Sequence, residues 1–227
     1  MSRFLIVNAD DFGQSDGINR GVIQAHEQGI VTSASLMVRW PAALEAAAYA
    51  RARPALAIGL HVDLGEWVQR DGNWVQLYHV PGEVGGELAR QLARFRELVG
   101  RDPTHVDSHQ HVHRKEPVHS ALVALAEGLG APLRFYTDEV SYCGDFYGQI
   151  ANGDPYYEGI AIETLLEIIA SLPSGTTELG CHPGLDDDIE SMYRTERERE
   201  VEVLCDPRAR AALFAAGVGL RSFADLR

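Results

Sequence analysis

The sequence contains few cysteines. Only three of its 227 residues are cysteine, Cys143, Cys181 and Cys205, and no two of them form a CxxC pair. An odd number of widely spaced cysteines is typical neither of a disulfide framework nor of a thiolate zinc site. The cysteine content therefore favours a reducing compartment, and we expect a cytoplasmic protein.

Basic residues are also scarce. The chain has 20 Lys and Arg against 33 Asp and Glu, which gives a formal net charge of -13 at pH 7. A charge of this sign repels a phosphate backbone, and no basic cluster reverses it locally. We therefore expect no nucleic-acid partner.

Long hydrophobic runs are absent. The N-terminal segment MSRFLIVNADD has four apolar residues in a row, too few for the hydrophobic region of a signal peptide. No later run approaches the length of a membrane span, so we expect no membrane partner. The sequence also lacks GxGxxG after the first expected strand and GxxxxGK[ST] anywhere, which disfavours a nucleotide-binding fold.

Short apolar runs alternate with longer amphipathic ones along the chain. We expect strands at residues 4–9, 33–38, 55–62, 104–109, 132–137, 177–182 and 217–222. Helices are expected at residues 16–29, 41–54, 86–100, 117–130, 160–172 and 191–206. The last of these helices is highly charged, and we expect its charges to face water.

The alternation of strands and helices predicts βαβ units and a parallel sheet. We expect one α/β domain over residues 1–227, an irregular (β/α) TIM-like barrel of about seven parallel strands. An open doubly wound sheet is the alternative. Residues 65–86 interrupt the alternation and are expected to form a long surface loop.

Four of the nine histidines lie in the segment HVDSHQHVH, residues 105 to 113. In an extended chain, alternate side chains point to one face. One face of this segment would then carry four histidines and one aspartate in a row: His105, Asp107, His109, His111 and His113. Four such positions span roughly 20 Å at about 6.7 Å per pair, so a single ion cannot bind them all. We expect one or two to bind a metal and the others to orient these ligands or contact substrate.

Further polar residues follow other expected strands: Asp10 with Asp11, His61, and His182. In a parallel barrel these strand ends face one rim, which holds the active site. Each residue also has an ordinary structural explanation, as a helix cap, a buried core histidine or a surface residue in a turn. Together they match metal-assisted hydrolysis, which needs three protein ligands, an open position for water, a base and an acid.

Five segments, spread over nearly the whole chain, carry a resemblance to a known family: LIVNADDFGQSDGIN, IVTSASLMV, LAIGLHVDL, THVDSHQHVH and LGCHPG. In the same order they resemble segments of the YdjC/ChbG carbohydrate deacetylases, which are related to polysaccharide deacetylases. The resemblance implies a hydrolase that removes an N-acetyl group from an N-acetylglucosamine-type mono- or oligosaccharide and releases acetate. It also implies one divalent metal ion, Mg²⁺ or Zn²⁺, an irregular (β/α) barrel, and a homodimer.

The resemblance also assigns roles to residues. It implies Asp11, His61 and His109 as the metal ligands, Asp10 as the base and His182 as the acid. Our hypothesis for the mechanism is that Asp10 takes a proton from the attacking water. His182, as an imidazolium, would then protonate the departing amine.

Three more residues are expected to contact substrate or to support the ligands: His111, His113 and Arg134. One alternative function is a metal-dependent phosphoesterase or an amidohydrolase acting on something other than a sugar. Phosphoester chemistry usually places Arg or Lys near the ion, and the nearby candidates are few: Arg114, Lys115 and Arg134. A non-catalytic sugar-binding protein on the same fold is the third interpretation.

The sequence departs from the chitooligosaccharide-acting members of the family in two places. The segment after His61 is shorter, and residues 138–158 have no obvious counterpart. Aromatic residues of these two segments could stack on sugar rings or pack locally: Trp67, Trp74, Tyr142, Phe146, Tyr147, Tyr156 and Tyr157.

Overall fold

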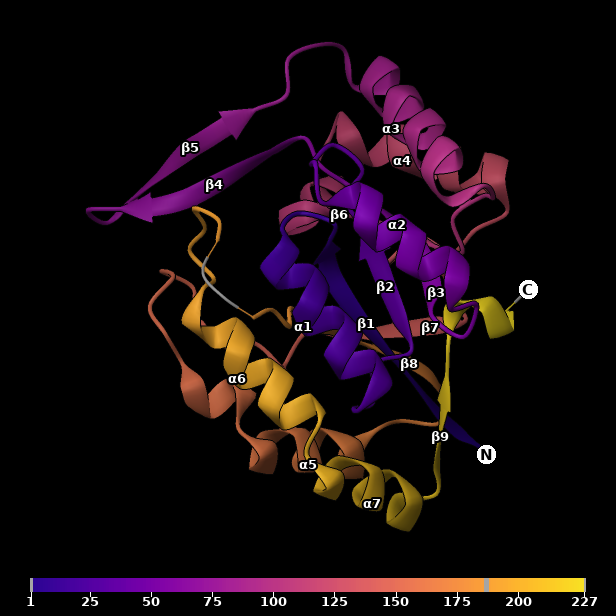
Figure 1. Cartoon of the computed structure of the whole chain (residues 1–227), viewed down its shortest axis with the longest axis vertical. Coiled ribbons are helices and arrows are strands. Elements are labelled where there is room, and N and C mark those ends of the chain that lie inside the picture. The colour runs from indigo at the N-terminus through magenta and orange to yellow at the C-terminus, as the bar shows by residue number, and fades with distance from the viewer. Residues whose placement is uncertain (1, 186–187, 227) are drawn as a thin grey trace.

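A curled sheet of seven parallel strands forms the centre of the computed structural model, which describes residues 2–185 and 188–226 (Figure 1). The strands are β1 (Arg3–Phe12), β2 (Ser33–Leu36), β3 (Ala57–Val62), β6 (Val106–Ser108), β7 (Val140–Cys143), β8 (Gly175–Cys181) and β9 (Val218–Arg221). Their order along the sheet is β6-β3-β2-β1-β8-β7, and β9 pairs with the N-terminal half of β1. The described residues show no pairing between β6 and β7, so the barrel is open on that side.

Helices surround this sheet (Figure 1). They are α1 (Asp16–Glu27), α2 (Ala43–Ala52), α3 (Val84–Val99), α4 (Val118–Leu129), α5 (Ile162–Ser171), α6 (Thr195–Leu204) and α7 (Pro207–Ala216). Short 3₁₀ segments are η1 (His109–Arg114), η2 (Tyr157–Ile160) and η3 (Phe223–Leu226). The expected irregular (β/α) barrel of about seven parallel strands is therefore confirmed.

The first strand shows how the fold positions polar residues. Its last eight residues are all buried, as expected for a parallel strand covered on both faces. Near its end, Asp11 has a φ of 63°, a left-handed conformation that is uncommon outside glycine. The side chain of Ser15, rather than that of Asp10 or Asp11, caps helix α1 by accepting a hydrogen bond from the Ile18 backbone. Helix capping therefore does not account for the two aspartates.

The strand expected at residues 132–137 is wrong. Within this segment, Leu133 forms one isolated parallel β-bridge, to Val106. Phe135 has a φ of 70°, so the chain turns there instead of extending. The fifth strand of the sheet in sequence order is β7, within a region where the sequence shows no clear pattern.

The loop expected at residues 65–86 is also wrong for most of its length. It contains an antiparallel hairpin of β4 (Gly65–Arg70) and β5 (Asn73–His79), which projects from the body of the protein (Figure 1). The turn residues Asp71 and Gly72 both have positive φ, 51° and 76°. Positive φ at both central positions favours an Asp-Gly pair and matches the twist of a two-residue hairpin.

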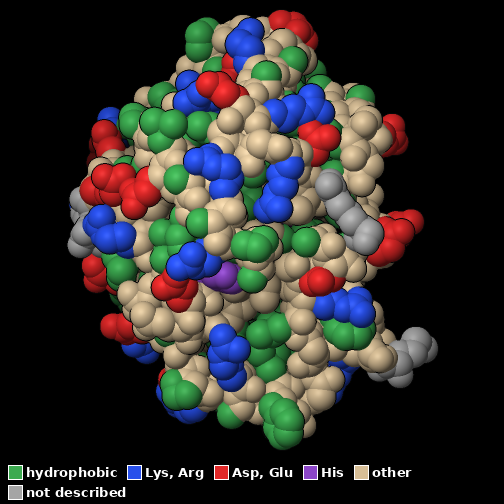
Figure 2. Space-filling view, turned by 45° about the vertical axis from the view of Figure 1, so that its right-hand side comes forward, with side chains coloured by type: hydrophobic (Ala, Val, Ile, Leu, Met, Phe, Trp, Pro, Cys, Tyr) green, Lys and Arg blue, Asp and Glu red, His purple; other side chains and the backbone are tan. Residues whose placement is uncertain are grey.

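Charges of both signs lie on the surface. On the face shown in Figure 2, Lys and Arg side chains are interspersed with Asp and Glu, and only a small area of histidine is visible. Of the helices that the structure describes, none has the length and apolar character needed to cross a membrane.

Candidate metal and catalytic site

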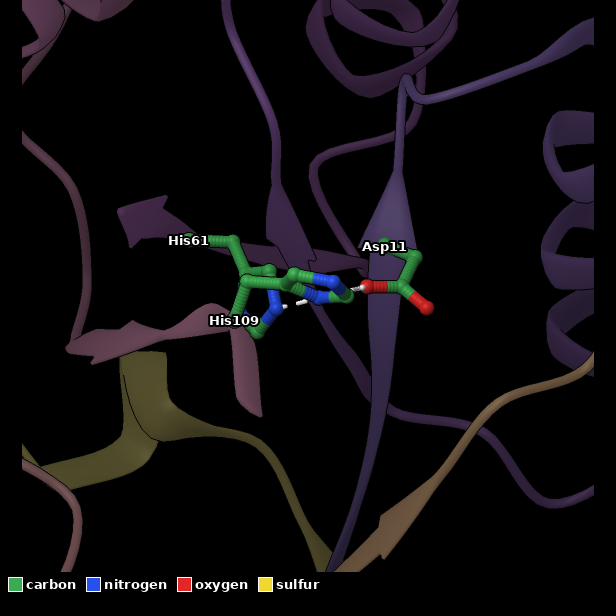
Figure 3. A group of neighbouring side chains, drawn as sticks. All are labelled: Asp11, His61 and His109. Atoms are coloured by element: carbon green, nitrogen blue, oxygen red, sulfur yellow. Dashed lines mark hydrogen bonds and ion pairs between the residues drawn. The ribbon is translucent and has the colours of Figure 1, made fainter. Parts of the chain in front are cut away.

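One carboxylate and two imidazoles converge at the carboxyl ends of three strands of the sheet, β1, β3 and β6 (Figure 3). Asp11 lies at the end of β1, His61 on β3, and His109 directly after β6. The Nε2 atom of His61 is 3.4 Å, and the Nδ1 atom of His109 3.1 Å, from Oδ1 of Asp11. One ligand atom from each residue lies within 4.8 Å of the others, and all three residues are buried. This donor set can hold a divalent cation and leave a position open.

The histidine segment is not extended, so the expected row of side chains is wrong. Strand β6 ends at Ser108, and both Gln110 and His111 have positive φ, 50° and 51°. The chain therefore turns and sends the four histidines to different places. His105 is buried against η3, and only His109 joins the convergent group.

His111 and His113 take separate positions. His113 is fully buried, with Nδ1 2.6 Å from Oγ of Ser108 and Nε2 3.2 Å from the carbonyl oxygen of Arg134. It holds the η1 turn together and is not among the residues that line the adjacent cavity. His111 does line that cavity, and burial together with the nearby Arg134 charge lowers its pKa to about 3. His111 is thus a neutral group at the cavity wall.

A buried carboxylate supports His61. The Nδ1 atom of His61 donates to Oδ1 of Asp107 at 2.7 Å, which directs Nε2 toward Asp11. Burial would lower the pKa of His61, but the charges of Asp107 and Asp10 outweigh it and raise this pKa well above its usual value. The other oxygen of Asp107 accepts a hydrogen bond from Ser35 at 2.7 Å. Carboxylates of this kind commonly fix the orientation of metal-binding imidazoles.

Arg134 is buried among three carboxylates. Its two terminal nitrogens bind both oxygens of Asp10, at 2.7 and 2.8 Å, and one of them also reaches Asp107 at 2.8 Å and Glu178 at 2.6 Å. Burial raises the pKa of Asp10, but the Arg134 charge outweighs it, so this pKa lies below its usual value. Arg134 is 4% exposed and does not line the cavity. It is therefore placed to orient Asp10 and not to touch substrate.

His182 follows β8 on the other side of Asp10. Its Nε2 atom is 3.8 Å from Oδ2 of Asp10, and its Nδ1 atom is 4.0 Å from Oε1 of Glu200. Its backbone N–H donates to the same Glu200 carboxylate, which fixes the position of the turn. Burial lowers the pKa of His182 to about 4, although Asp10 and Asp11 act in the opposite direction. The ring is therefore neutral at pH 7.

Helix α6 is not the solvated helix that its charges suggest. Glu196, Arg197 and Glu200 are all buried, and Arg197 donates to Oδ2 of Asp11 at 2.7 Å. Burial raises the pKa of Glu200 to about 8. A signal was present, because Arg197 and the apolar Val201 are four residues apart and share one helical face. That face packs inward, so these polar side chains surround the site.

A cavity of about 1010 Å³ opens over this group. Four of the aromatic residues singled out in the sequence line it: Trp67, Trp74, Tyr142 and Tyr147. Phe146 is instead buried in the core, and Tyr156 and Tyr157 are not among the lining residues. Other cavity residues include Arg114, Lys115 and Glu66, the last a buried carboxylate that the sequence did not point to.

Comparisons with known proteins show the family of this chain. The family model described as YdjC-like protein matches residues 4–215. A chitooligosaccharide deacetylase of Serratia marcescens is 34% identical over 261 residues, covering 100% of both chains. A carbohydrate deacetylase of Geobacillus stearothermophilus is 34% identical over 252 residues, covering 99% of this chain and 98% of its own.

Solved structures give the same result for the fold. A candidate cellobiose-phosphate cleavage protein from Enterococcus faecalis superposes with a TM-score of 0.82 at 29% identity, over 100% of this chain and 99% of its own. A family 4 carbohydrate esterase from Streptomyces lividans superposes with a TM-score of 0.56 at 12% identity, over 96% and 91% of the two chains. The second likeness concerns the fold alone. On the family match and the full-length similarity, this chain belongs to the family of YdjC-like proteins.

Proposed function

We propose that this protein is a metal-dependent carbohydrate N-deacetylase. It would remove an N-acetyl group from an N-acetylglucosamine-type mono- or oligosaccharide and release acetate. The observation that carries the proposal is the convergence of Asp11, His61 and His109 beside the paired Asp10, in a chain similar over its full length to carbohydrate deacetylases.

Asp11, His61 and His109 would hold the cation. Two imidazoles and one carboxylate suit Zn²⁺ better than Mg²⁺, which prefers oxygen ligands. When bound, the cation supplies Lewis-acid polarisation of the acetyl carbonyl and makes water more acidic. Arg197 already neutralises part of the Asp11 charge, through the oxygen that does not face the two imidazoles.

Asp10 is placed to act as the base. Its lowered pKa keeps it ionised at neutral pH, and Arg134 holds both of its oxygens in position. The carboxylate lines the cavity next to the proposed ligands and can accept a proton from the attacking water.

His182 is placed to deliver a proton to the leaving group. Because its pKa is about 4, it is neutral before the reaction, unlike the imidazolium expected from the sequence. Its Nε2 atom lies 3.8 Å from Oδ2 of Asp10. Once the two groups approach to hydrogen-bond distance, or through one bridging water, the proton that Asp10 takes from the attacking water can pass to His182 and then to the amine nitrogen. One proton of the attacking water reaches the amine, which leaves uncharged, while the acid product keeps the water oxygen and the second proton and loses that proton to solvent to become acetate.

The cavity suits a sugar substrate. Its volume of about 1010 Å³ is at the top of the roughly 300–1,000 Å³ range of small-molecule sites, which leaves room for more than one sugar ring. Trp67 and Trp74 are 43% and 49% exposed and line the cavity, so each can offer an apolar ring face to a bound sugar.

The test is acetate release from a panel of N-acetylated mono- and oligosaccharides. Metal-stripped protein is assayed alone and after addition of Zn²⁺, Mg²⁺, Mn²⁺ or Co²⁺. We expect no activity without metal and the highest activity with Zn²⁺ or Co²⁺. Full activity after stripping, or release of phosphate from sugar phosphates without acetate release, would refute the proposal.

A further inference from the structure

Glu66 is a buried carboxylate that the proposed reaction does not use. It lies on β4 of the hairpin, is 2% exposed and lines the cavity. Its Oε2 atom is 3.9 Å from Nε2 of His109. That nitrogen is buried, and the described residues provide no hydrogen-bond partner for it. Buried polar atoms without partners are rare and destabilising, so we expect a function for the Nε2 atom of His109 and for the carboxylate that faces it.

The other imidazole of the site, that of His61, indicates what Glu66 can do for His109. His61 turns one nitrogen toward Asp11 and donates from the other to Asp107 at 2.7 Å. His109 likewise turns Nδ1 toward Asp11, and its other nitrogen faces Glu66. The two imidazoles thus have the same arrangement, and they differ in that the outer carboxylate of His109 is 3.9 Å away instead of 2.7 Å.

A second contact joins the same two segments. The backbone N–H of Trp67 donates to the side-chain oxygen of Gln110 at 2.9 Å, and the side-chain amide of Gln110 donates to the carbonyl of Trp67 at 2.7 Å. Glu66 and Trp67 are consecutive on the hairpin, and His109 and Gln110 are consecutive after β6. Two adjacent residues of the hairpin therefore lie against two adjacent residues of η1.

We infer that Glu66 is a positioning residue for His109, and that it couples occupation of the metal site to the position of the β4–β5 hairpin. This inference rests on the proposed metal-dependent function. An Nε2–H of His109 that donates to Glu66 would leave Nδ1, which faces Asp11, unprotonated and able to act as a ligand. Because Glu66 precedes Trp67 on β4 and both line the cavity, a shorter contact between Glu66 and His109 would act on the part of the hairpin that forms the cavity wall.

The geometry favours support of His109 over direct ligation by Glu66. Among the described residues, two groups of side chains have ligand atoms that all lie within 4.8 Å of one another, and Glu66 joins neither of them. The groups are Asp11 with His61 and His109, and Asp10 with His61 and Asp107. Its oxygen faces the nitrogen of His109 that points away from Asp11.

The experiment measures the Zn²⁺ affinity of metal-stripped protein by competition with a chelator. Glu66→Ala should weaken binding 10- to 100-fold, the usual cost of losing an outer partner of a metal ligand. Glu66→Gln should restore part of it, because the amide oxygen still accepts a hydrogen bond. The matched control is Glu190→Gln, since Glu190 is exposed and pairs with Arg70 of the same hairpin, and its affinity should equal that of the wild type.

Coupling to the hairpin has its own measurement. Zn²⁺ should change the tryptophan fluorescence of the wild type, with most of the change lost in Trp67→Phe and in Glu66→Ala even at saturating metal. Wild-type affinity in Glu66→Ala, or loss of one oxygen ligand from its bound Zn²⁺ by X-ray absorption, would overturn the inference.

Failure of the proposed function would look different. A wild type that binds Zn²⁺ and releases no acetate from any sugar in the panel would refute the deacetylase but leave the Glu66 result intact. Circular dichroism of each variant, together with the near-isosteric Glu66→Gln, separates these outcomes from misfolding.

Discussion

Replacing Arg134 with Met tests how far the site depends on one buried charge. Arg134 binds Asp10, Asp107 and Glu178 at 2.6 to 2.8 Å, and all four residues are buried. Breaking a buried ion pair by removing one partner costs about 3–5 kcal/mol. Here three carboxylates would be left together, so we expect the cost to reach about 5 kcal/mol, a large part of the roughly 5–15 kcal/mol that stabilises a domain.

Urea unfolding at pH 7, followed by circular dichroism, measures this cost. Arg134→Lys should lose less stability because the positive charge remains, but its acetate release should fall sharply, since an ammonium cannot hold both oxygens of Asp10. The matched control is Arg94→Met, which removes an exposed pair with Glu97 and should cost less than about 1 kcal/mol. If Arg134→Met were within about 1 kcal/mol of the wild type, the guanidinium would not stabilise the buried carboxylates as argued.

Three further predictions follow from the site. Asp11→Asn should abolish Zn²⁺ binding, measured by metal analysis after dialysis, and a fully loaded, active variant would contradict the ligand assignment. Because burial raises the pKa of Glu200 from 4.5 to about 8, the folded protein loses stability as the pH rises through that window. Glu200→Gln should therefore flatten the pH dependence of the urea midpoint between pH 5 and 8, and an unchanged slope would contradict it. Trp74→Ala should raise KM for N-acetylated oligosaccharides roughly 2- to 10-fold with little change in kcat, and an unchanged KM would exclude stacking there.

The sequence predicted the first half of the sheet well because its strands are buried on both faces. Apolar runs at residues 4–9, 33–38 and 55–62 correspond to β1, β2 and β3. The strands expected at 104–109, 177–182 and 217–222 likewise correspond to β6, β8 and β9, whereas the four residues of β7 were not predicted. The run at 132–137 has the composition of a strand, but it turns at Phe135, whose left-handed backbone is set by tertiary contacts rather than by local preference.

Two elements that are missing from the expected strands and helices have clear local signals in the sequence. Asp71-Gly72 between alternating residues is a strong hairpin signal, and it predicts the β4–β5 turn. Asp206 followed by Pro207 is typical of a helix start, and the side chain of Asp206 caps α7 by accepting from the Arg208 backbone. In both cases the local sequence is sufficient to predict the turn or the helix start.

The residues of the site also differ in how far the sequence predicted them. The strand-end positions of Asp11 and His61 follow from parallel topology, because the carboxyl ends of such strands share one rim. The choice of His109 came from the family resemblance, since the alternation of residues 105–113 assumed an extended chain that stops at Ser108. The structure brings these three side chains together, and their role as ligands stays a prediction until metal is measured.

The supporting residues depend on which strands are neighbours, and this the sequence does not reveal. His61 and Asp107 are register partners on the adjacent parallel strands β3 and β6, although 46 positions separate them. A shift of one residue in that register would turn Asp107 to the opposite face and leave the Nδ1 atom of His61 without its carboxylate. The three residues of β6 therefore fix both the orientation of His61 and the point at which the chain turns to present His109. A strand of three residues, inside the segment 104–109 that the sequence predicts as extended, positions two of the three proposed ligands.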